Sequence, residues 1–433
     1  MGEPVIVVGG GLAGLMCAAT LAREGLPVVV LDAGGELGGR ATTTRHEGFL
    51  INEGAHALYP SSEGLLKSAG VRVKGGHPRP DKGAVLRGGE LHPAPLSPRG
   101  LFGSGPLSGG ERARLLGTLA SVGARDPGRL GEADAASWIA GRAPSQALAD
   151  LLGGLLRLST YCGELSALPA ELGVGVLREA LRRPVRYVDG GWREIVGGLA
   201  ASAGAAGAAL QPHSKVEELL ADQGVRGVRL SDGSELRGCA VVLAGLSPSR
   251  AGRLLSGAGG TPPLQAPRPV RAACLDVALS ELPRPGCPFA LGLDEPLYLS
   301  VHTTWARLAP GRGAVVHLLR YDDGSELRDT AARERLEGLL DQAQPGWRER
   351  VVHQRFAPRM TVAHHLPSPA EGLRSRPRAD QTGIDGVFLA GDWVGAEGWL
   401  APAALLSGRA AAAAVALRLR SGARPGRAAA PVA

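Results

Sequence analysis

Lysine is scarce in this sequence, although the sequence is basic. Of its 48 lysine and arginine residues only four are lysines, and the formal net charge is +7. The arginines are spread along the whole chain. No basic run is interleaved with aromatic residues, which make up only 4% of the sequence. We therefore expect no nucleic-acid partner.

Cysteine motifs and long apolar runs are also missing. The five cysteines form no CxxC pair, which argues against both a zinc site and a disulfide framework, and we predict no bound metal. No apolar stretch reaches the roughly 18 residues that a membrane span needs. The first strand starts almost at once, without the pattern of a secretory signal. We expect a cytoplasmic protein and leave peripheral contact with a membrane open; nothing indicates the oligomeric state.

The 433 residues suggest about two domains. Residues 4–8 form an apolar run typical of a strand buried on both faces, and residues 9–11 are three glycines. Residues 12–24 have helical periodicity, Gly25 fits a helix end, and residues 28–31 form a second buried strand. Strand, glycine turn, helix and strand make one βαβ unit, which predicts an α/β fold with a Rossmann-type domain.

Further elements follow from local patterns. A hairpin is predicted at residues 85–91, helices between 111 and 183, and several strands between 216 and 244. Other predicted strands cover residues 272–279, 297–301, 315–320, 351–356 and 386–392. A final helix is expected over 402–419, followed by a disordered tail from Ser421.

The glycine turn carries the first functional motif. Gly9, Gly11 and Gly14 have the GxGxxG spacing, in which the glycines allow a tight turn, a close approach to a pyrophosphate and close helix packing. Asp32 ends the second strand, where its carboxylate can accept hydrogen bonds from ribose hydroxyls. The motif predicts a bound dinucleotide and by itself leaves NAD and FAD open.

Three further segments resemble one family. They are residues 36–42, which contain Gly38-Gly39-Arg40; residues 48–56, which end in Gly54-Ala55-His56; and residues 388–393 with 407–411, which contain Gly391-Asp392. Together they resemble the superfamily of FAD-dependent amine oxidases and phytoene desaturases, and the phytoene desaturase-like branch is favoured. Asn52 stands where the family usually has Asp, and Pro402 stands where it usually has Glu.

The resemblance implies FAD, held without a covalent bond. It implies that Arg40 binds phosphate, that Asp392 bonds a ribityl hydroxyl or phosphate, and that the start of the last helix points at the flavin. The cofactor-binding residues implied are Gly9, Gly11, Leu12, Ala13, Gly14, Asp32, Gly39, Arg40, Ala55, Val216, Gly391, Asp392, Leu400 and Ala401. We predict an FAD-binding domain from residues 1–75, 184–255 and 365–433, interleaved with an α+β substrate domain from 76–183 and 256–364.

Within this family, amine oxidation is not the favoured reaction. Amine oxidases of the family usually place a lysine near the flavin from the middle strands, and no lysine follows Lys215 here. We predict an oxidoreductase of the desaturase, dehydrogenase or oxidase type that takes a hydride from a small apolar, isoprenoid-like substrate. His56 and His302 are the catalytic candidates. Pocket candidates are Tyr59, Tyr298, Trp305, Trp393 and Trp399.

Alternatives stay open at this point. A flavin amine oxidase or a protoporphyrinogen oxidase-like enzyme fits the same cofactor motifs. A non-catalytic binding protein of this fold is a reading of another class, because fold does not determine function. A dehydrogenase that uses only NAD(P) would not need the block around Asp392.

Overall fold

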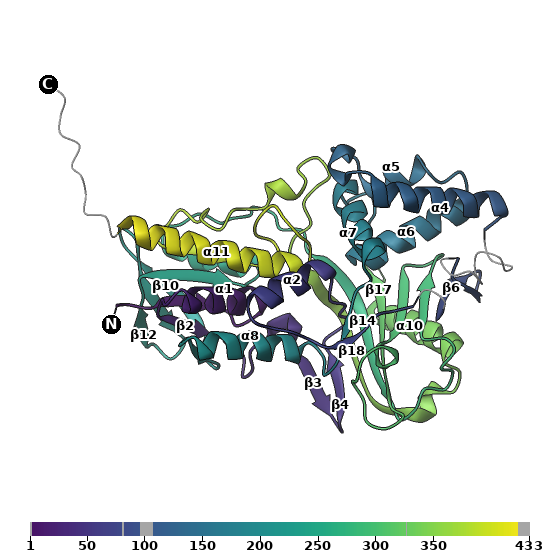
Figure 1. Cartoon of the computed structure of the whole chain (residues 1–433), viewed down its shortest axis with the longest axis horizontal. Coiled ribbons are helices and arrows are strands. Elements are labelled where there is room, and N and C mark those ends of the chain that lie inside the picture. The colour runs from purple at the N-terminus through teal and green to yellow at the C-terminus, as the bar shows by residue number, and fades with distance from the viewer. Residues whose placement is uncertain (1, 80–81, 96–106, 326, 423–433) are drawn as a thin grey trace.

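The computed structural model describes residues 2–79, 82–95, 107–325 and 327–422. The elements form two parts, one built on a parallel sheet and one on a larger sheet with a group of helices (Figure 1). The tail predicted to be disordered lies outside the described residues, except for Ser421 and Gly422, which end helix α11 (Ala401–Gly422).

The first part is built on a sheet of five parallel strands in the order β19-β13-β1-β2-β9. In the middle of it, Val5 of β1 pairs with Val28 of β2 and Ala240 of β13. All of β1 is buried, which explains its uninterrupted apolar sequence. The predicted α/β class is confirmed. The strands are β1 (Val5–Val8), β2 (Val28–Leu31), β9 (Ala209–Gln211), β13 (Ala240–Ala244) and β19 (Val387–Ala390).

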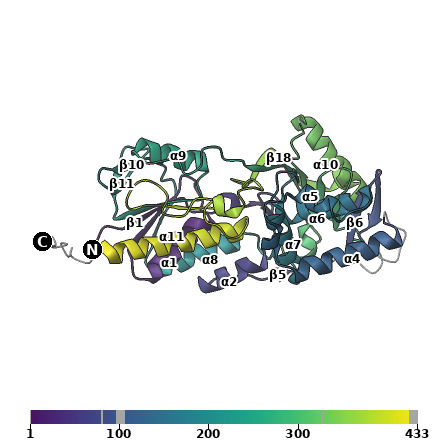
Figure 2. The same cartoon turned by 90° about the horizontal axis from the view of Figure 1, so that it is seen from above.

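Helices and a small sheet cover this parallel sheet. Helix α1 (Leu12–Arg23) contacts both α8 (Arg193–Ala205) and α11, and Figure 2 shows the three helices together. The opposite face, which carries Ile6 and Val8, shares its core with a three-stranded sheet and with helix α9. These elements are β10 (Val216–Ala221), β11 (Val225–Leu230), β12 (Glu235–Arg237) and α9 (Pro248–Gly257).

The second part contains a seven-stranded sheet in the order β18-β14-β17-β16-β15-β6-β7. On one face Leu275 and Val277 of β14 pack with helix α10 (Asp329–Ala343). On the other face Cys274 packs with Ala55 and Tyr161, so this face looks toward the first part. The strands are β6 (Gly83–Arg87), β7 (Glu90–Pro93), β14 (Val270–Leu279), β15 (Phe289–Gly292), β16 (Leu297–Val301), β17 (Ala314–Tyr321) and β18 (Val351–Ala363).

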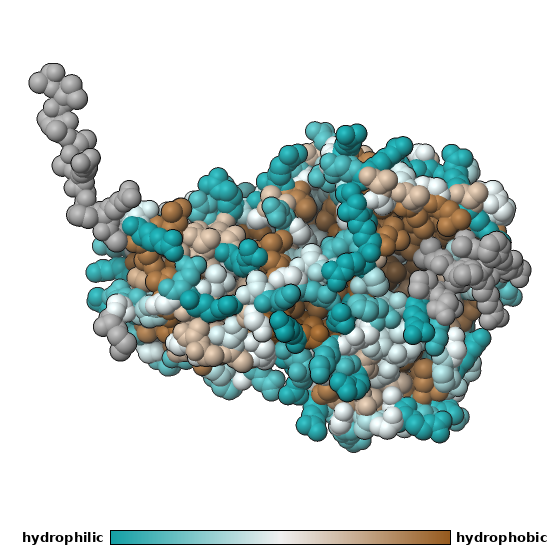
Figure 3. Space-filling model, viewed as in Figure 1, coloured by the Kyte–Doolittle hydropathy of each residue, from teal (hydrophilic) through white to brown (hydrophobic). Residues whose placement is uncertain are grey.

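A group of helices lies at the far end of the second part (Figure 1). In the same view, Figure 3 shows apolar residues exposed at this end among hydrophilic ones. The helices are α4 (Gly109–Ala124), α5 (Ala135–Ala140), α6 (Gln146–Thr160) and α7 (Ala170–Arg182). Smaller elements join the two parts: the hairpin β3 (Thr43–His46) and β4 (Phe49–Asn52), helix α2 (Pro60–Ser68), and the pair β5 (Gly75–Gly76) and β8 (Tyr187–Val188).

The chain crosses between the two parts several times. The five parallel strands lie within the three segments predicted for the cofactor domain, and the strands of the larger sheet lie within the two predicted insertions. The domain boundaries themselves stay a prediction.

The sequence predicted no apolar stretch long enough for a membrane span, and helix α11 corrects this prediction. By length and composition alone, its residues 401–421 are long and apolar enough to cross a membrane. More than half of this stretch is buried inside the protein, and a Cβ on Gly408 would lie 2.3 Å from the carbonyl oxygen of Ala13 in α1. The apolar composition of α11 is therefore accounted for by helix packing. Contact with a membrane surface stays a prediction.

Candidate cofactor and active site

A cavity of about 950 Å³ lies between the carboxyl ends of the parallel strands and strand β18. Its volume is at the upper end of the ~300–1,000 Å³ typical of ligand pockets. The carboxyl edge of a parallel sheet is where such folds bind ligands. The residues implied as cofactor-binding line it, except Gly14: Gly9, Gly11, Leu12, Ala13, Asp32, Gly39, Arg40, Ala55, Val216, Gly391, Asp392, Leu400 and Ala401.

The glycine turn has the geometry that the sequence predicted. Gly9 has a φ of 108°, and a Cβ there would lie 2.0 Å from the carbonyl oxygen of Ala244. A Cβ on Gly14 would lie 1.9 Å from the carbonyl oxygen of Gly9, so Gly14 serves helix packing and not the cavity. A Cβ on Gly11 would have nothing closer than 3.7 Å, although Gly11 lines the cavity. The space in front of Gly11 is therefore free for a ligand.

The start of helix α1 points into the same space. Its N-cap residue, Gly11, offers no side chain to cap the helix, and Leu12 and Ala13 of the first turn line the cavity. Uncapped N–H groups and the positive end of the helix dipole favour an anion. This part of the cavity suits a pyrophosphate.

Asp32 marks one end of the cavity. Its carboxylate accepts hydrogen bonds from the backbone N–H groups of Gly10 (2.6 Å) and Gly34 (2.7 Å). Lys215 and Val216 line the cavity with it. Because a carboxylate has about four lone-pair positions, Asp32 can still accept bonds from ribose hydroxyls. We call this region the ribose end.

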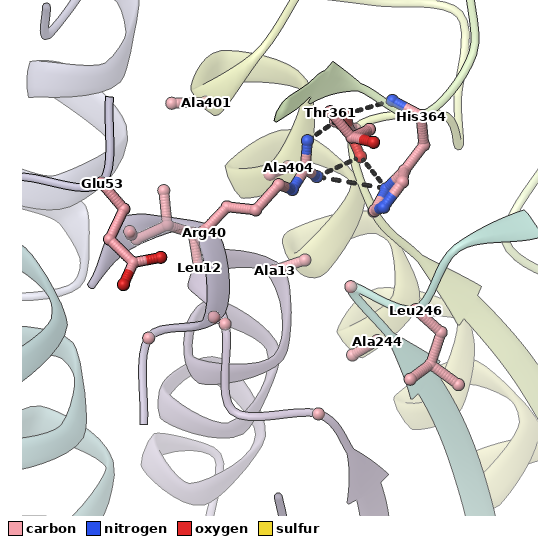
Figure 4. Close-up of a pocket in the computed structure, with 18 of the residues that line it drawn as sticks. Leu12, Ala13, Arg40, Glu53, Ala244, Leu246, Thr361, His364, Ala401 and Ala404 are labelled. Carbon is pink, nitrogen blue, oxygen red and sulfur yellow. Dashed lines mark hydrogen bonds and ion pairs between the residues drawn. The ribbon is translucent and has the colours of Figure 1, made fainter. Parts of the chain in front are cut away.

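Arg40 and Asp392 form an ion pair in the middle of the cavity. Figure 4 shows Arg40 reaching toward His364 there. Two nitrogens of Arg40 lie 2.7 and 3.1 Å from the two carboxylate oxygens of Asp392. The backbone N–H and the Nδ1 atom of His364 are 3.0 and 2.8 Å from the same carboxylate. Burial raises the pKa of Asp392, but the Arg40 charge and the bonds from His364 outweigh it and hold that pKa below its usual range. Asp392 therefore stays ionised.

The start of helix α11 forms another wall. Leu400 precedes it with a φ of 55°, a left-handed conformation that is uncommon for a leucine. Ala401 and Ala404 line the cavity, and Ser407 exchanges hydrogen bonds with the backbone of Gly391. Pro402, in the first turn, is compatible with a helix start, as predicted.

The end of the cavity away from Asp32 lies against the second part of the molecule. We call it the ring end, because a dinucleotide with its ribose at Asp32 and its pyrophosphate at α1 extends in this direction. Glu53 and Arg355 face each other here at 3.5 Å. Other residues that line this end are Ala55, His56, Ala57, Tyr59, Tyr161, Ala357, Pro358, Arg359, Met360, Thr361 and Val362.

Neither candidate histidine offers a free nitrogen to this end. His56 lines the cavity, but its Nδ1 and Nε2 atoms each lie 2.9 Å from a backbone carbonyl oxygen, of Gly54 and Arg40. His302 is buried outside the cavity, with its ring 4.2 Å from those of Tyr187 and His317. The prediction for His302 is therefore wrong, because its strand end faces the interior of the second part.

Only one aromatic pocket candidate lines the cavity. Tyr59 does, with its hydroxyl donating to the carbonyl of Ser159 at 2.5 Å. The other four are corrected. The indole of Trp393 donates to Leu246 and that of Trp399 to Thr160, both from buried positions. Tyr298 is buried in β16, and Trp305 packs with the cluster around Phe49, so neither reaches the cavity.

Several lining residues were missed by the sequence analysis. Tyr161 ends helix α6, Arg355 and Met360 lie on β18, and His364 follows that strand. None lies in a recognisable motif. Glu53 stands inside the segment that resembles the family, so its position gave a signal that was not used.

The chemistry of this cavity fits FAD. An acid lies at the ribose end, free helix N–H groups and Arg40 lie in the middle, and Gly39, with a φ of 54°, has open space where a Cβ would stand. Among the described residues no cysteine lines the cavity, which agrees with a cofactor held without a covalent bond.

Solved structures share this fold. An oxidoreductase from Methanosarcina mazei superposes with a TM-score of 0.70 at 18% identity, covering 94% of this chain and 99% of that one. Putrescine oxidase bound to putrescine gives a TM-score of 0.69 at 16% identity, covering 96% and 99%. At these identities the likeness shows the fold alone.

Curated relatives match over a short region. The mitochondrial protoporphyrinogen oxidase of Nicotiana tabacum is 34% identical over 117 residues, which is 26% of this chain and 23% of the relative. The protoporphyrinogen oxidase of Homo sapiens is 33% identical over 120 residues, or 24% and 25%. The matches thus span about a quarter of the length of these relatives.

The family itself is shown by a match over nearly the whole chain. The model of the flavin-containing amine oxidoreductases matches residues 12–416, from the first helix past the pairing of Arg40 with Asp392 to the last helix. The chain therefore belongs to the flavin-containing amine oxidoreductase family, and it is an FAD-dependent oxidoreductase.

Proposed function

We propose that this enzyme takes a hydride from an apolar, uncharged part of its substrate and is not a typical amine oxidase. The observation that carries the proposal is the ring end of the cavity. Its side chains are mostly apolar, and it carries two arginines, Arg355 and Arg359, with one carboxylate, Glu53, which lies 3.5 Å from Arg355. Such a wall has no excess of negative charge with which to attract a cationic amine.

The positions of lysine support the same reading. Among the described residues, Lys215 is the lysine that lines the cavity, and it lies at the ribose end beside Val216. The tyrosines of the ring end are also engaged, because Tyr59 donates to Ser159 and Tyr161 donates to Ala55. These two tyrosines therefore do not form an aromatic cage with free hydroxyls that could hold an amine.

Two substrate classes fit an apolar ring end. A porphyrinogen is favoured by the names of the curated relatives, which are protoporphyrinogen oxidases. An isoprenoid is favoured by the likeness of the sequence to phytoene desaturases. In both classes the C–H bond that breaks is activated by neighbouring double bonds, and FAD supplies the hydride acceptor.

The test is anaerobic mixing of the FAD-loaded enzyme with each candidate while flavin absorbance is followed. We expect protoporphyrinogen IX or an isoprenoid to bleach the flavin within seconds, and putrescine and benzylamine to leave it oxidised. Rapid bleaching by the amines, with none by the apolar compounds, would overturn the proposal in favour of an amine oxidase.

A further inference from the structure

We propose that Glu53 accepts the proton that the substrate loses when it is oxidised. The inference rests on the proposed function, because removing a hydride and forming a double bond also releases one proton. The group that takes this proton must face the ring end of the cavity and have a free basic atom.

The other carboxylates of the cavity are committed elsewhere. Asp32 lies at the ribose end, where it binds the backbone N–H groups of Gly10 and Gly34. Asp392 lies in the middle, where Arg40 and His364 occupy both of its oxygens. Neither reaches the ring end.

The remaining polar groups of the ring end are poor proton acceptors. The nitrogens of His56 face two backbone carbonyls, and burial lowers the pKa of this histidine. The hydroxyls of Tyr59 and Tyr161 donate to carbonyls, and burial raises the pKa of both. His364 also lines the cavity, but it is bound through Nδ1 to Asp392 and lies on the other side of Arg40 from Glu53 in Figure 4, away from the ring end.

Glu53 has the placement that these groups lack. It follows strand β4 and lines the cavity, and its side chain is 38% exposed, so a proton on it can pass to water. In Figure 4 its carboxylate points away from the cluster of Arg40 and His364. Glu53 lies on the opposite side of this view from Ala244, which ends strand β13, and from Leu246 after it.

Strand β18 holds Glu53 through a row of polar residues that begins at the half-buried Arg355 and continues into the interior. Arg355 contacts Glu53 on one side, and its Nε and a terminal nitrogen donate to Asp276 at 3.1 and 2.8 Å on the other. Asp276 also lies 2.6 Å from Nδ1 of His317, and both are fully buried. Arg355, Asp276 and His317 are cross-strand partners on β18, β14 and β17. These three are positioning residues, which act on the substrate only through Glu53.

The step balances as follows in atoms and electrons. One substrate C–H bond breaks and its electron pair leaves with the hydrogen as hydride to the cofactor. An adjacent N–H or C–H bond gives its proton to a carboxylate oxygen of Glu53, and its electron pair becomes the new double bond. The substrate loses two electrons, which the cofactor takes up, and the neutral carboxylic acid returns its proton to solvent.

The first test compares FAD-loaded wild type, Glu53→Gln and Glu47→Gln. Glu47 is a matched control, since it lies on the turn of the same hairpin, with a side chain 70% exposed, and does not line the cavity. Each protein is mixed anaerobically with protoporphyrinogen IX across a range of pH. We expect Glu53→Gln to slow flavin reduction by about 10²–10⁴-fold and to abolish the loss of rate at acidic pH. Glu47→Gln should behave as wild type.

The titratable groups around Glu53 are Arg355 and, beyond it, Asp276 and His317, and His56 lies on the same loop. Variants of these residues are therefore not controls. A rate and pH profile unchanged in Glu53→Gln, at equal FAD content, would overturn the proposal. If no apolar substrate reduces the flavin of the wild-type enzyme, that result would instead contradict the proposed function.

A second measurement needs no turnover. Benzylamine, benzyl alcohol and benzoate have the same ring with positive, neutral and negative charge. Their binding to the oxidised FAD-loaded protein is followed by the flavin spectrum. Because Glu53 lies 3.5 Å from Arg355, Glu53→Gln removes a carboxylate from beside that guanidinium and should strengthen benzoate at least tenfold relative to benzyl alcohol. Unchanged ratios would show that Glu53 does not face the ring end and would overturn the proposal on this ground alone.

Discussion

Arg40 and Asp392 are 352 positions apart in the sequence and form a two-point ion pair, with nitrogen–oxygen distances of 2.7 and 3.1 Å. Arg40 is 41% exposed toward the cavity, whereas Asp392 is 2% exposed. The buried carboxylate thus holds the guanidinium in place. Its terminal nitrogens also contact Val362 and His364, so Nε is the donor of the planar fork that faces no protein acceptor among the described residues and can bind phosphate. Two predictions concern this pair and the turn beside it.

Asp392→Asn should weaken FAD retention and lower the free energy of unfolding by about 1–3 kcal/mol. The folded-state pKa of Asp392 lies below its usual range, so its contribution is complete above the unfolded value of about 3.9 and is lost as pH falls below it. Denaturation series at pH 7 and pH 3 check this. The variant should lose less stability on acidification than wild type does, and equal losses would contradict the assignment.

Gly11→Ala and Gly14→Ala should separate cofactor binding from folding. At Gly11 a Cβ fits the protein but enters the cavity, so this variant should keep the wild-type Tm without FAD and lose affinity for it. At Gly14 a Cβ meets backbone at 1.9 Å, which should cost at least about 1–3 kcal/mol of stability without FAD. Thermal melts of both apoproteins and FAD titrations decide. Similar behaviour of the two variants would argue against this reading.

Asp32→Ala should weaken FAD binding by roughly 1–3 kcal/mol, because charge-assisted bonds to ribose are lost. Since Asp32 also binds Gly10 and Gly34, part of the effect comes from a looser turn. Asp32→Asn is the matched variant, because it keeps one acceptor. FAD affinity is measured by fluorescence and apoprotein stability by urea. Unchanged affinity in Asp32→Ala would rule out the ribose contact.

Acid precipitation of the holoenzyme should leave the yellow colour in the supernatant. The reason is that no cysteine among the described residues lines the cavity. Of the lining histidines, His56 is bonded through both nitrogens to backbone, and His364 is bonded through Nδ1 to Asp392. A yellow pellet, or a peptide carrying the mass of FAD, would refute non-covalent binding.

Asp276→Asn should destabilise the protein by about 3–5 kcal/mol, since it leaves buried His317 and Arg355 without their carboxylate. A double-mutant cycle with Arg355→Met tests the link through urea denaturation. We expect Arg355→Met to lower the free energy of unfolding much less in the Asp276→Asn variant than in wild type. Additive losses would mean that the two residues do not act together.

The cofactor-binding half of the site was predictable because its residues lie in local motifs. Gly9, Gly11 and Asp32 belong to one βαβ unit, in which spacing along the chain determines position in space. The pairing of Arg40 with Asp392 could not be derived from spacing, yet the resemblance to the family brought both to the cofactor.

The ring end was not predictable, because it depends on which face each strand presents. Strand β16 is buried along its whole length although it contains Ser300, so its sequence does not reveal that His302 after it turns inward. Strand β18 runs well past its predicted end, and Met360 lies in that extension. Trp393 follows the Gly391-Asp392 motif directly, but its indole is buried and donates a hydrogen bond to the carbonyl of Leu246.

The separation of Arg40 from Asp392 has a consequence for synthesis of the protein. After Arg40, a ribosome adds 352 residues up to the carboxylate that orients it, and the helix start at Ala401 follows later still. A nascent or prematurely ended chain therefore has the glycine turn but lacks one wall of the site. We therefore expect retention of the cofactor to require the segment that carries Asp392 and Ala401.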